Sequence, residues 1–306
     1  MKIGEIVWFN GELKSREDCK IDLLTHALHY GTGVFEGIRA YEQPNGRAGI
    51  FRLKKHMERL QQSAKVLGFS VPYSVDELCT GAKETVSKNN LKTCYIRPLA
   101  FIGSGPLGMS FGKTPPIQTA IMTWEWGSYL GDDGINNGIR VKTSSQIRPH
   151  VNSVMTKGKI TGNYAMGVVA KQEALSLGYD EALLLDPNGY VCEGSGENLF
   201  ALIDGKILTP PRTSILPGIT RNSVLTLLES QGLRGEEALF TRDDLYFAEE
   251  VFMCGTAAEI TPVSEIDGRK IKDGKPGALT KKIQSLYMDS VQGKHPEFSK
   301  KWVTVV

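Results

Sequence analysis

The sequence contains no closely spaced pair of cysteines. Its five cysteines are scattered over 306 residues, odd in number and without a C-x-x-C motif. Disulfide frameworks and thiolate metal sites require paired spacing, so we expect neither, and we predict that the protein holds no metal ion. Unpaired cysteines are typical of a reducing compartment, and we therefore expect a cytoplasmic location.

Long apolar runs and an excess of charge of one sign are also absent. No run of eighteen apolar residues occurs, so we expect no membrane-spanning helix. The 36 lysines and arginines nearly balance the 34 aspartates and glutamates, which argues against a surface for nucleic acid or for an anionic membrane. The apolar residues are numerous enough for a substantial core. We therefore expect a globular protein that handles a small molecule.

The sequence patterns predict a mixed fold, either α+β or layered α/β. Apolar residues recur at helical spacing over 53–67, and the runs CYIRPLAFI (94–102) and IQTAIMTW (117–124) are typical of strands. Residues 124–136 are rich in glycine and turn formers. We therefore predict a linker there, between a smaller domain, 1–123, and a larger domain, 137–306.

The second part of the chain continues this mixture. IRVKTSS (139–145) is typical of a strand, and a helix is expected over about 163–178. Turn sequences at 186–189 and 204–205 predict hairpins, and hence antiparallel pairing nearby. Further helices are expected from about Gly218, from about Thr241 and over 277–291.

Several motifs match a ligand-binding pattern only in part. GSGPLG (103–108) has the spacing of a dinucleotide-binding loop, but two prolines at 115–116 block the helix that such a loop requires. GKT (112–114) lacks the earlier glycine of a phosphate loop. His26 and His29 have no acidic or thiolate partner at ligand spacing. We therefore reject a dinucleotide site, a phosphate loop and a histidine metal site.

Two other glycine-containing segments are better candidates for binding an anion. LPGITR (216–221) opens a predicted helix, whose first turn leaves the backbone N–H groups of residues 218–220 unpaired. FMCGTAAEI (252–260) ends a predicted strand in the small residues 255–257, which let backbone amides approach an anion closely.

Together with TKGKITGNY (156–164) and CEGSGENLF (192–200), these segments resemble the class IV family of pyridoxal-phosphate enzymes. The resemblance runs from HALHYGTGVFEGIRAY to EVFMCGTAAEITPV. Within the family the chain is most similar to the branched-chain amino acid aminotransferases, through the ordered tracts HYGTGVFEGIR, YIRPLAF, WEWGSYLG, EGSGENLF, LPGITR and GTAAEITPV. The resemblance implies the two-domain fold type IV, with a smaller N-terminal α/β domain and a larger domain that contains a pseudo-barrel of strands. It also implies that pyridoxal 5'-phosphate binds at the domain interface.

The resemblance also distinguishes the two lysines of TKGKITGNY, which composition alone would place in solvent. The family's cofactor lysine stands four residues before an Asn-Tyr pair, which identifies Lys159 as the catalytic Schiff-base lysine and Lys157 as a bystander. A lysine amine can lose its proton, bond to the cofactor aldehyde and move the α-proton of the substrate.

The same resemblance implies the other cofactor contacts. Glu193 is expected to pair with the pyridine nitrogen and keep it protonated, and Tyr164 is expected to bond the ring hydroxyl. Helical periodicity alone predicts that Arg59 faces solvent, whereas the resemblance makes it a phosphate ligand. The remaining implied cofactor-binding residues are Leu216, Gly218, Ile219, Thr220, Gly255 and Thr256.

Tyr95 and Arg97 are two residues apart on a predicted strand, so their side chains leave from one face. The resemblance places both in the substrate pocket, where Arg97 is our candidate to hold a distal carboxylate. The other implied pocket residues are Phe35, Gly37, Trp126, Tyr129, Thr256 and Ala257, with Tyr30, Leu107 and Met109 contributed by the neighbouring subunit. A homodimer at minimum is therefore implied, with a hexamer, a trimer of dimers, as the larger assembly.

The implied function is reversible amino transfer between branched-chain L-amino acids (leucine, isoleucine, valine) and 2-oxoglutarate. The kinetics should be ping-pong, through the Lys159 Schiff base and pyridoxamine phosphate. The sequence leaves three alternative functions open. A D-amino acid aminotransferase should lack the YIRP and WGSYLG tracts, an aminodeoxychorismate lyase would release pyruvate without an amino acceptor, and an inactive binding protein would not respond to leucine.

Overall fold

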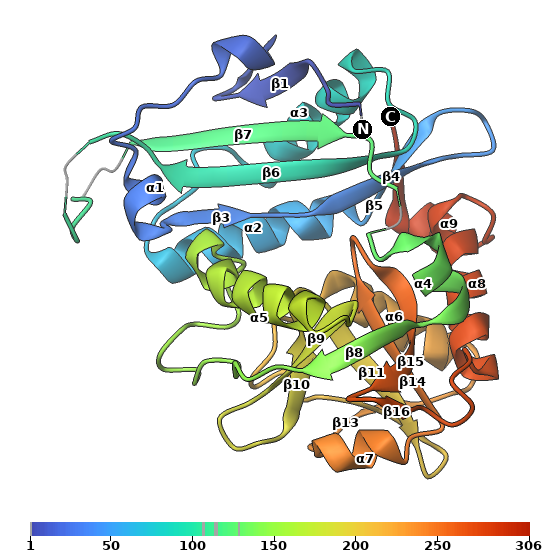
Figure 1. Ribbon diagram of the computed structural model, residues 1–306. Helices are drawn as coiled ribbons and strands as arrows, with labels where there is room; N and C mark the ends of the chain where they lie inside the picture. Colours follow the sequence, from blue (N-terminus) through green and yellow to red (C-terminus); the bar gives the residue numbers. More distant parts are fainter. Residues whose placement is uncertain (1, 106–107, 113–115, 128) are drawn as a thin grey trace. The chain divides into compact units, whose positions relative to one another are not determined.

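The computed structural model describes residues 2–105, 108–112, 116–127 and 129–306 (Figure 1). The chain packs as two units. The first consists of Met1–Trp126, Lys157–Asn163 and Asp289–Val306, and the second of Gly127–Thr156 and Tyr164–Met288. None of the described helices is long and apolar enough to cross a membrane.

These units are discontinuous in sequence, whereas the predicted domains are continuous. The chain first passes from one unit to the other after Trp126, inside the predicted linker 124–136, but 157–163 and 289–306 belong to the first unit. The linker stretch also contains a short helix, α4 (Gly131–Asn137). Local composition marks where a chain turns but not which sheet a later segment joins. The assignment of domains 1–123 and 137–306 stays a prediction.

The first unit contains an antiparallel sheet with the strand order β17-β5-β4-β6-β7-β1-β2, in which β3 also pairs with β6. Its strands are β1 (Ile6–Phe9), β2 (Glu12–Ser15), β3 (Gly33–Phe35), β4 (Ile38–Glu42), β5 (Ala48–Phe51), β6 (Cys94–Ile102), β7 (Ile117–Trp124) and β17 (Val303–Val305). Strands β6 and β7 coincide with the two predicted apolar runs.

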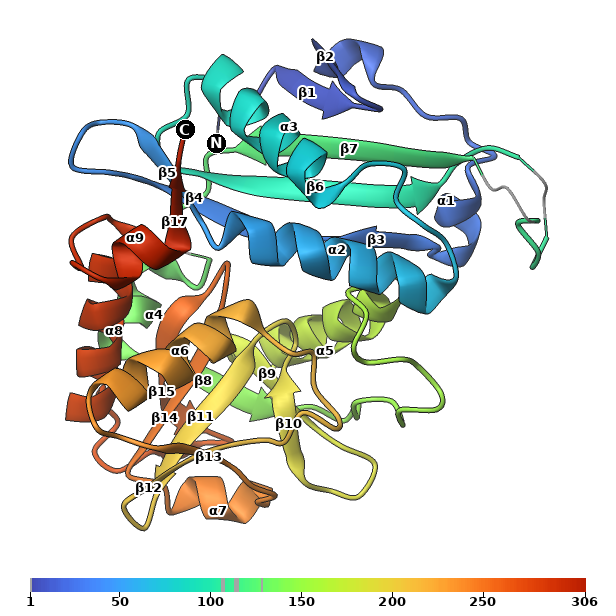
Figure 2. The same ribbon diagram turned by 180° about the vertical axis from the view of Figure 1, so that it is seen from behind.

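Two helices, α2 (Leu53–Leu67) and α3 (Val75–Lys88), cover one face of this sheet (Figure 2). The predicted apolar stripe of α2 is confirmed, because Leu53, Met57 and Leu60 are buried in the core between helix and sheet. The short helices of this unit are η1 (Arg16–Asp18), α1 (His26–Tyr30), η2 (Thr161–Asn163) and α9 (Phe298–Trp302).

Strands β3 and β4 pair with the same edge of β6, and Glu36 and Gly37 lie between the two strands. Both strands pair with β6 in one continuous register, which places Glu36 opposite Pro98. The Glu36 N–H donates to the Pro98 carbonyl at 2.9 Å, but a proline has no N–H to return. The ladder is therefore broken here, and two residues of the candidate site lie in the gap.

The second unit is built on a curled sheet with the strand order β10-β9-β8-β15-β14-β11-β12-β13, in which β16 pairs with β15. Its strands are β8 (Ile139–Thr143), β9 (Glu181–Leu185), β10 (Val191–Gly194), β11 (Asn198–Ile203), β12 (Lys206–Thr209), β13 (Gly235–Glu237), β14 (Glu250–Gly255), β15 (Glu259–Ile266) and β16 (Arg269–Lys270). The two predicted hairpins, β9–β10 and β11–β12, are confirmed as antiparallel. Strand β8 differs, since it runs parallel to both β9 and β15.

The helices predicted in this part of the chain are all present. They are α5 (Tyr164–Ser176), α6 (Ile219–Ser230), α7 (Arg242–Tyr246) and α8 (Ala278–Val291). Helix α6 begins directly after Gly218, as the sequence predicts, and its Val224, Leu227 and Leu228 are buried. This start fixes the direction of the first amides of α6.

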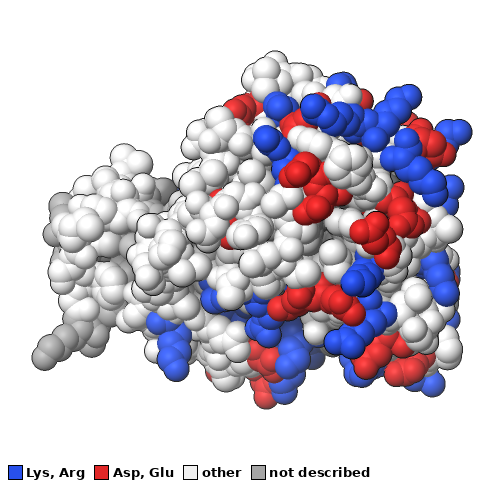
Figure 3. Space-filling view, turned by 90° about the horizontal axis from the view of Figure 1, so that it is seen from below, with Lys and Arg blue, Asp and Glu red and all other residues white. Residues whose placement is uncertain are grey.

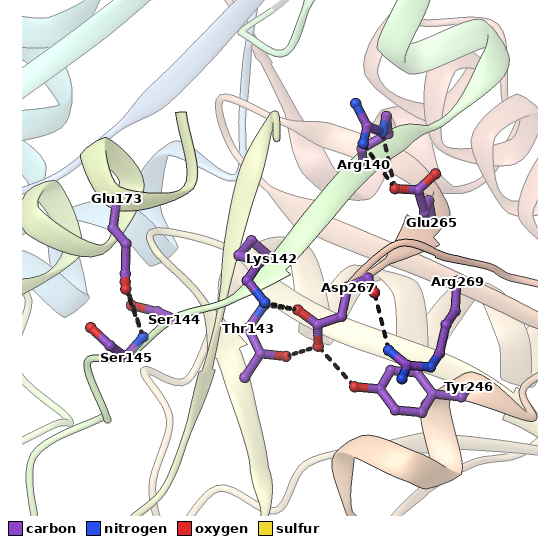
Figure 4. A network of polar contacts seen from close by, with 10 residues as sticks. All are labelled: Arg140, Lys142, Thr143, Ser144, Ser145, Glu173, Tyr246, Glu265, Asp267 and Arg269. Carbon is purple, nitrogen blue, oxygen red and sulfur yellow. Dashed lines mark hydrogen bonds and ion pairs between the residues drawn. The ribbon is translucent and has the colours of Figure 1, made fainter. Parts of the chain in front are cut away.

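Asp267 joins the parallel strands β8 and β15 to α7 (Figure 4). Its carboxylate accepts hydrogen bonds from Lys142 Nζ at 2.8 Å, from the Thr143 N–H at 2.9 Å and from the Thr143 hydroxyl at 2.6 Å. The Tyr246 hydroxyl donates another at 2.8 Å. Burial raises the pKa of Asp267, but the bonds from Lys142 and Thr143 outweigh it and lower the pKa to about 2. The charged carboxylate therefore ties three elements together.

We expect Asp267→Ala to lower the free energy of unfolding by about 2 kcal/mol, because several donors lose their acceptor. Tyr246→Phe removes one of these bonds and should cost about 1 kcal/mol. Urea denaturation followed by circular dichroism measures both. Since folding lowers the pKa of Asp267, its contribution is present above about pH 4 and is lost as the pH falls through about 2. An Asp267→Ala protein as stable as wild type at pH 7 would contradict this role of the carboxylate.

Candidate functional site

The backbone of Lys159 is held on both sides within the first unit. The Lys159 N–H donates to the Ser63 hydroxyl on α2 at 2.9 Å, and the Lys159 carbonyl accepts from the Phe35 N–H of β3 at 3.0 Å. Ile160 forms a bridge with Val34 next to these bonds. The segment thus continues the sheet at the edge of β3, which fixes where the lysine side chain starts. Lys157, two residues earlier, is exposed.

The Lys159 amine lies among aromatic and charged side chains. Its Nζ is 4.8 Å from the centre of the Phe35 ring. Burial lowers the pKa of the amine, and the nearby Arg59 lowers it further, while Glu36 opposes them; the result is about 8. An ordinary lysine titrates above about 10. About a tenth of the Lys159 amine is therefore unprotonated at pH 7, far more than for an ordinary lysine, and it is this form that acts as a nucleophile or a base.

Arg59 is buried, so the solvent-facing position that helical periodicity predicts is wrong. Its Nε lies 2.6 Å from Glu36 Oε1 and its Nη2 lies 2.8 Å from Glu36 Oε2. His56 Nδ1 is 2.7 Å from the same Oε2. Burial would raise the pKa of Glu36, but Arg59 and then His56 outweigh it and lower the pKa to about 2. Burial lowers the pKa of His56, so the neutral imidazole donates its Nδ1–H to a charged carboxylate.

Tyr95 and Arg97 leave β6 on one face, as their spacing predicts, and Arg97 Nη2 donates to the Tyr95 hydroxyl at 3.3 Å. The Arg97 guanidinium carbon stands 4.7 Å from the centre of the Phe35 ring and 5.5 Å from that of Trp124. Its Nε is buried and has no hydrogen-bond partner among the described residues. A cation is therefore held against aromatic rings with part of its hydrogen-bonding capacity unused.

Gly37 and Trp126 shape the space around Tyr95. A Cβ added at Gly37 would lie 1.9 Å from the Tyr95 hydroxyl, so no larger residue fits while Tyr95 stays in place. The Trp126 ring packs edge-on against Tyr95, with 4.8 Å between ring centres. The structure thus brings together the predicted substrate residues Phe35, Gly37, Tyr95, Arg97 and Trp126.

Glu193, on β10 of the second unit, is buried, and Arg148, Asn198 and Leu216 are among its partners. Its Oε1 is 2.8 Å from Arg148 Nη2. Its Oε2 accepts from Asn198 Nδ2 at 3.0 Å and from the Leu216 N–H at 3.2 Å. The contact with the arginine is a charge-assisted one, which is short and directional. The carboxylate is thus fixed in position, and Leu216 is linked to it directly.

The N-terminus of α6 lies next to this carboxylate in the structure. Asn198 Nδ2 also donates to the Leu216 carbonyl at 3.1 Å, and a Cβ added at Gly218 would lie 1.9 Å from Asn198 Oδ1. Gly218 caps α6 without a side chain, and the first residues, Ile219 and Thr220, are buried. The first amides of the helix therefore receive no capping side chain from Gly218, which suits an anion.

The remaining predicted residues lie on α5, at the end of β14 and at the surface. Tyr164 is the first residue of α5, and Gly255 ends β14, followed by the half-buried Thr256 and Ala257. The Tyr129 ring centre is 5.2 Å from Lys171 Nζ. Tyr30 and Met109 are exposed, and Leu107 lies outside the described residues.

Five residues that sequence reasoning missed hold the predicted ones in place: Glu36, His56, Ser63, Arg148 and Asn198. Two sequence signals were present. Residues 36 and 198 fall inside the family-like tracts HYGTGVFEGIR and EGSGENLF, and residues 56 and 63 share one side of α2 with Arg59 by helical spacing. Nothing in the local sequence of Arg148 marks it as a partner of Glu193.

Comparison with known proteins identifies the family to which the chain is similar. The chain matches the family model described as amino-transferase class IV over residues 33–266. A branched-chain-amino-acid aminotransferase from Pseudomonas aeruginosa is 48% identical over 301 residues, covering 98% of this chain and 97% of the relative. The predicted class, a mixture of α and β elements, is the fold of the solved relatives.

Two solved structures of branched-chain amino acid aminotransferases superpose closely on this chain. The enzyme from Escherichia coli is 42% identical, with a TM-score of 0.95 over 98% of both chains. The enzyme from Thermobaculum terrenum, solved in its PLP-form, is 33% identical, with a TM-score of 0.92 over 100% of this chain and 99% of that one.

Proposed function

Because the chain belongs to the class IV aminotransferase family, we propose that it transfers amino groups reversibly between branched-chain L-amino acids and 2-oxoglutarate. Pyridoxal 5'-phosphate is the cofactor, and the substrates are amino acids and 2-oxo acids. Relatives named for this activity match nearly the whole chain at high identity. The observation that carries the proposal is the Lys159 amine, whose pKa is lowered to about 8 and whose backbone is fixed on both sides.

The residues present fit the cofactor in charge and in hydrogen-bonding capacity. Lys159 offers the amine for its aldehyde, Glu193 a charged carboxylate for its ring nitrogen, and Tyr164 a hydroxyl for its ring hydroxyl. When bound, the cofactor supplies a protonated ring that withdraws electrons from the substrate α-carbon and carries the amino group between the two half-reactions. The phosphate is assigned to Arg59, Ile219, Thr220 and Thr256, with Leu216, Gly218 and Gly255 as further contacts.

Lys159 and Glu193 have separate tasks in this proposal. With the cofactor bound, the Lys159 amine would take the α-proton from the substrate and deliver it to the cofactor carbon that then carries the amino group. With a pKa of about 8, the Lys159 amine can both accept a proton and give it up, as the two directions of a reversible amino transfer require. Glu193 is held by Arg148, and its carboxylate would keep a proton on the ring nitrogen of the bound cofactor.

The substrate pocket must accept an aliphatic side chain in one half-reaction and a carboxylate in the other. The rings of Phe35, Tyr95 and Trp126 provide apolar walls, and Arg97 provides a cation with its Nε unused. Tyr129, Gly37 and the backbone amides of Thr256 and Ala257 complete the proposed pocket. A D-amino acid aminotransferase or an aminodeoxychorismate lyase is less favoured, because the relatives that match the whole chain are named for branched-chain substrates.

We also propose a homodimer at minimum, with a hexamer of three dimers as the larger form, and a cytoplasmic location. Leu23, Leu28, Tyr30 and Met109 expose between 43% and 87% of their surface, and a broad area in Figure 3 carries almost no charged side chains. Exposed apolar side chains such as these four favour protein contact. In the dimer, Tyr30, Leu107 and Met109 would serve the site of the other subunit.

Lys159→Ala should abolish amino transfer from L-leucine to 2-oxoglutarate, because the variant lacks the amine that bonds the cofactor and moves the α-proton. A coupled glutamate assay and the absorbance of the bound cofactor, with and without L-leucine, measure the effect. Lys157→Ala is the matched control and should retain activity. Turnover of D-alanine in place of L-leucine by the wild type, or wild-type activity in Lys159→Ala, would reject the proposal.

Arg97→Leu should separate the two half-reactions. The apolar replacement should leave L-leucine binding nearly unchanged, whereas L-glutamate binding should weaken by about 2–4 kcal/mol, because a charged contact to the distal carboxylate is lost. Single-turnover titration of the enzyme with each amino acid gives the two affinities. If both substrates weaken equally, Arg97 does not hold the distal carboxylate.

A further inference from the structure

Glu36 places a carboxylate on the apolar face of the first sheet. Side chains alternate along a strand, so Glu36 shares its face with Val34 and Ile38. All three are fully buried, and both neighbours belong to the core beneath α2 and α3. A charge in such surroundings is strongly destabilising unless it is paired, and an apolar residue would fill the position at lower cost. Its presence therefore requires a reason other than stability.

Both oxygens of the Glu36 carboxylate accept hydrogen bonds from side chains of α2. Both oxygens bond the Arg59 guanidinium, at 2.6 and 2.8 Å, and one oxygen also bonds His56 at 2.7 Å. This two-point contact fixes the plane of the guanidinium, which a single bond would not do. Exposed ion pairs, such as Lys55 with Glu58 on the same helix, impose no such restriction.

The same side of α2 also holds Lys159. His56, Arg59 and Ser63 follow one another at helical spacings of three and four residues, and all three are buried. Ser63 accepts the Lys159 N–H. The position of the amine and the orientation of the guanidinium therefore depend on one polar stripe of α2, and Glu36 supplies the carboxylate that accepts hydrogen bonds from two members of that stripe.

We propose that Glu36 is a positioning residue, which orients Arg59 toward the cofactor phosphate and balances its charge next to Lys159. This inference rests on the proposed use of pyridoxal phosphate. The groups that affect the pKa of the Lys159 amine most strongly include Arg59, Glu36, Tyr95 and Arg97, and His56 adjoins them through Glu36. Glu36 is the carboxylate of this set, so its removal leaves two arginines acting on the amine.

The first test compares two ligands that differ only in the phosphate. Apoenzyme carrying Glu36→Gln should bind pyridoxal phosphate at least about tenfold more weakly than wild type, because Arg59 is no longer oriented. Both affinities are measured above about pH 9, where most of the Lys159 amine is unprotonated in both proteins, and there pyridoxal, which lacks the phosphate, should bind within about twofold of its wild-type affinity. Glu58→Gln, the same change at the exposed pair of α2, should alter neither. Equal weakening of both ligands, or of neither, would overturn the inference.

The second test follows the Lys159 amine without any cofactor. The pH dependence of Lys159 modification by an amine reagent, read by peptide mass spectrometry of the apoenzyme, should shift to lower pH in Glu36→Gln, because an opposing charge is removed. A purely structural effect predicts no such shift, and an unchanged profile would contradict the proposal. Exposed lysines in the same sample serve as internal references.

If Glu36→Gln does not fold, the double variant Glu36→Gln/Arg59→Met, which removes both charges, should restore folding; a double variant that also fails to fold would overturn the pairing. If wild-type apoenzyme binds neither pyridoxal phosphate nor pyridoxal, the proposed function fails rather than the role of Glu36.

Discussion

The two hydrogen bonds of the Lys159 backbone determine where the reactive amine stands. One comes from Phe35 on an edge strand and the other goes to Ser63 on the helix that covers the sheet. The segment 157–163 is distant in sequence from both partners and yet belongs to their unit. A lysine on a freely moving loop would keep its charge in water. Here the fixed backbone holds the amine where burial and arginines reduce its affinity for a proton.

Each unit holds a buried carboxylate that is paired with an arginine and with neutral donors. Glu36 is bound by Arg59 and His56 in the first unit, and Glu193 by Arg148 and Asn198 in the second. Buried pairs of this kind contribute little net stability. What they provide is a charge in a fixed place and orientation, which electrostatic catalysis and anion binding both require.

The fold was predictable wherever short-range patterns decide it. β6 and β7 span the predicted residues, and α6 starts at the predicted glycine, because alternation, turns and helix starts are local. The burial of Arg59 could not be predicted in this way, because its partner Glu36 lies 23 positions earlier in the sequence, between β3 and β4. Residues 157–163 and 289–306 could not be assigned to the first unit for the same reason. Likewise, only the family resemblance distinguished Lys159 from Lys157, because composition treats both as solvated.

The most direct measurement of the central claim locates the covalent attachment of the cofactor. Purified protein is incubated with pyridoxal 5'-phosphate and reduced with borohydride, which makes the bond to a lysine amine permanent, and its peptides are mapped by mass spectrometry. We predict a single tagged peptide, with the tag on Lys159. A tag on Lys157, on any other lysine, or on none would contradict the account.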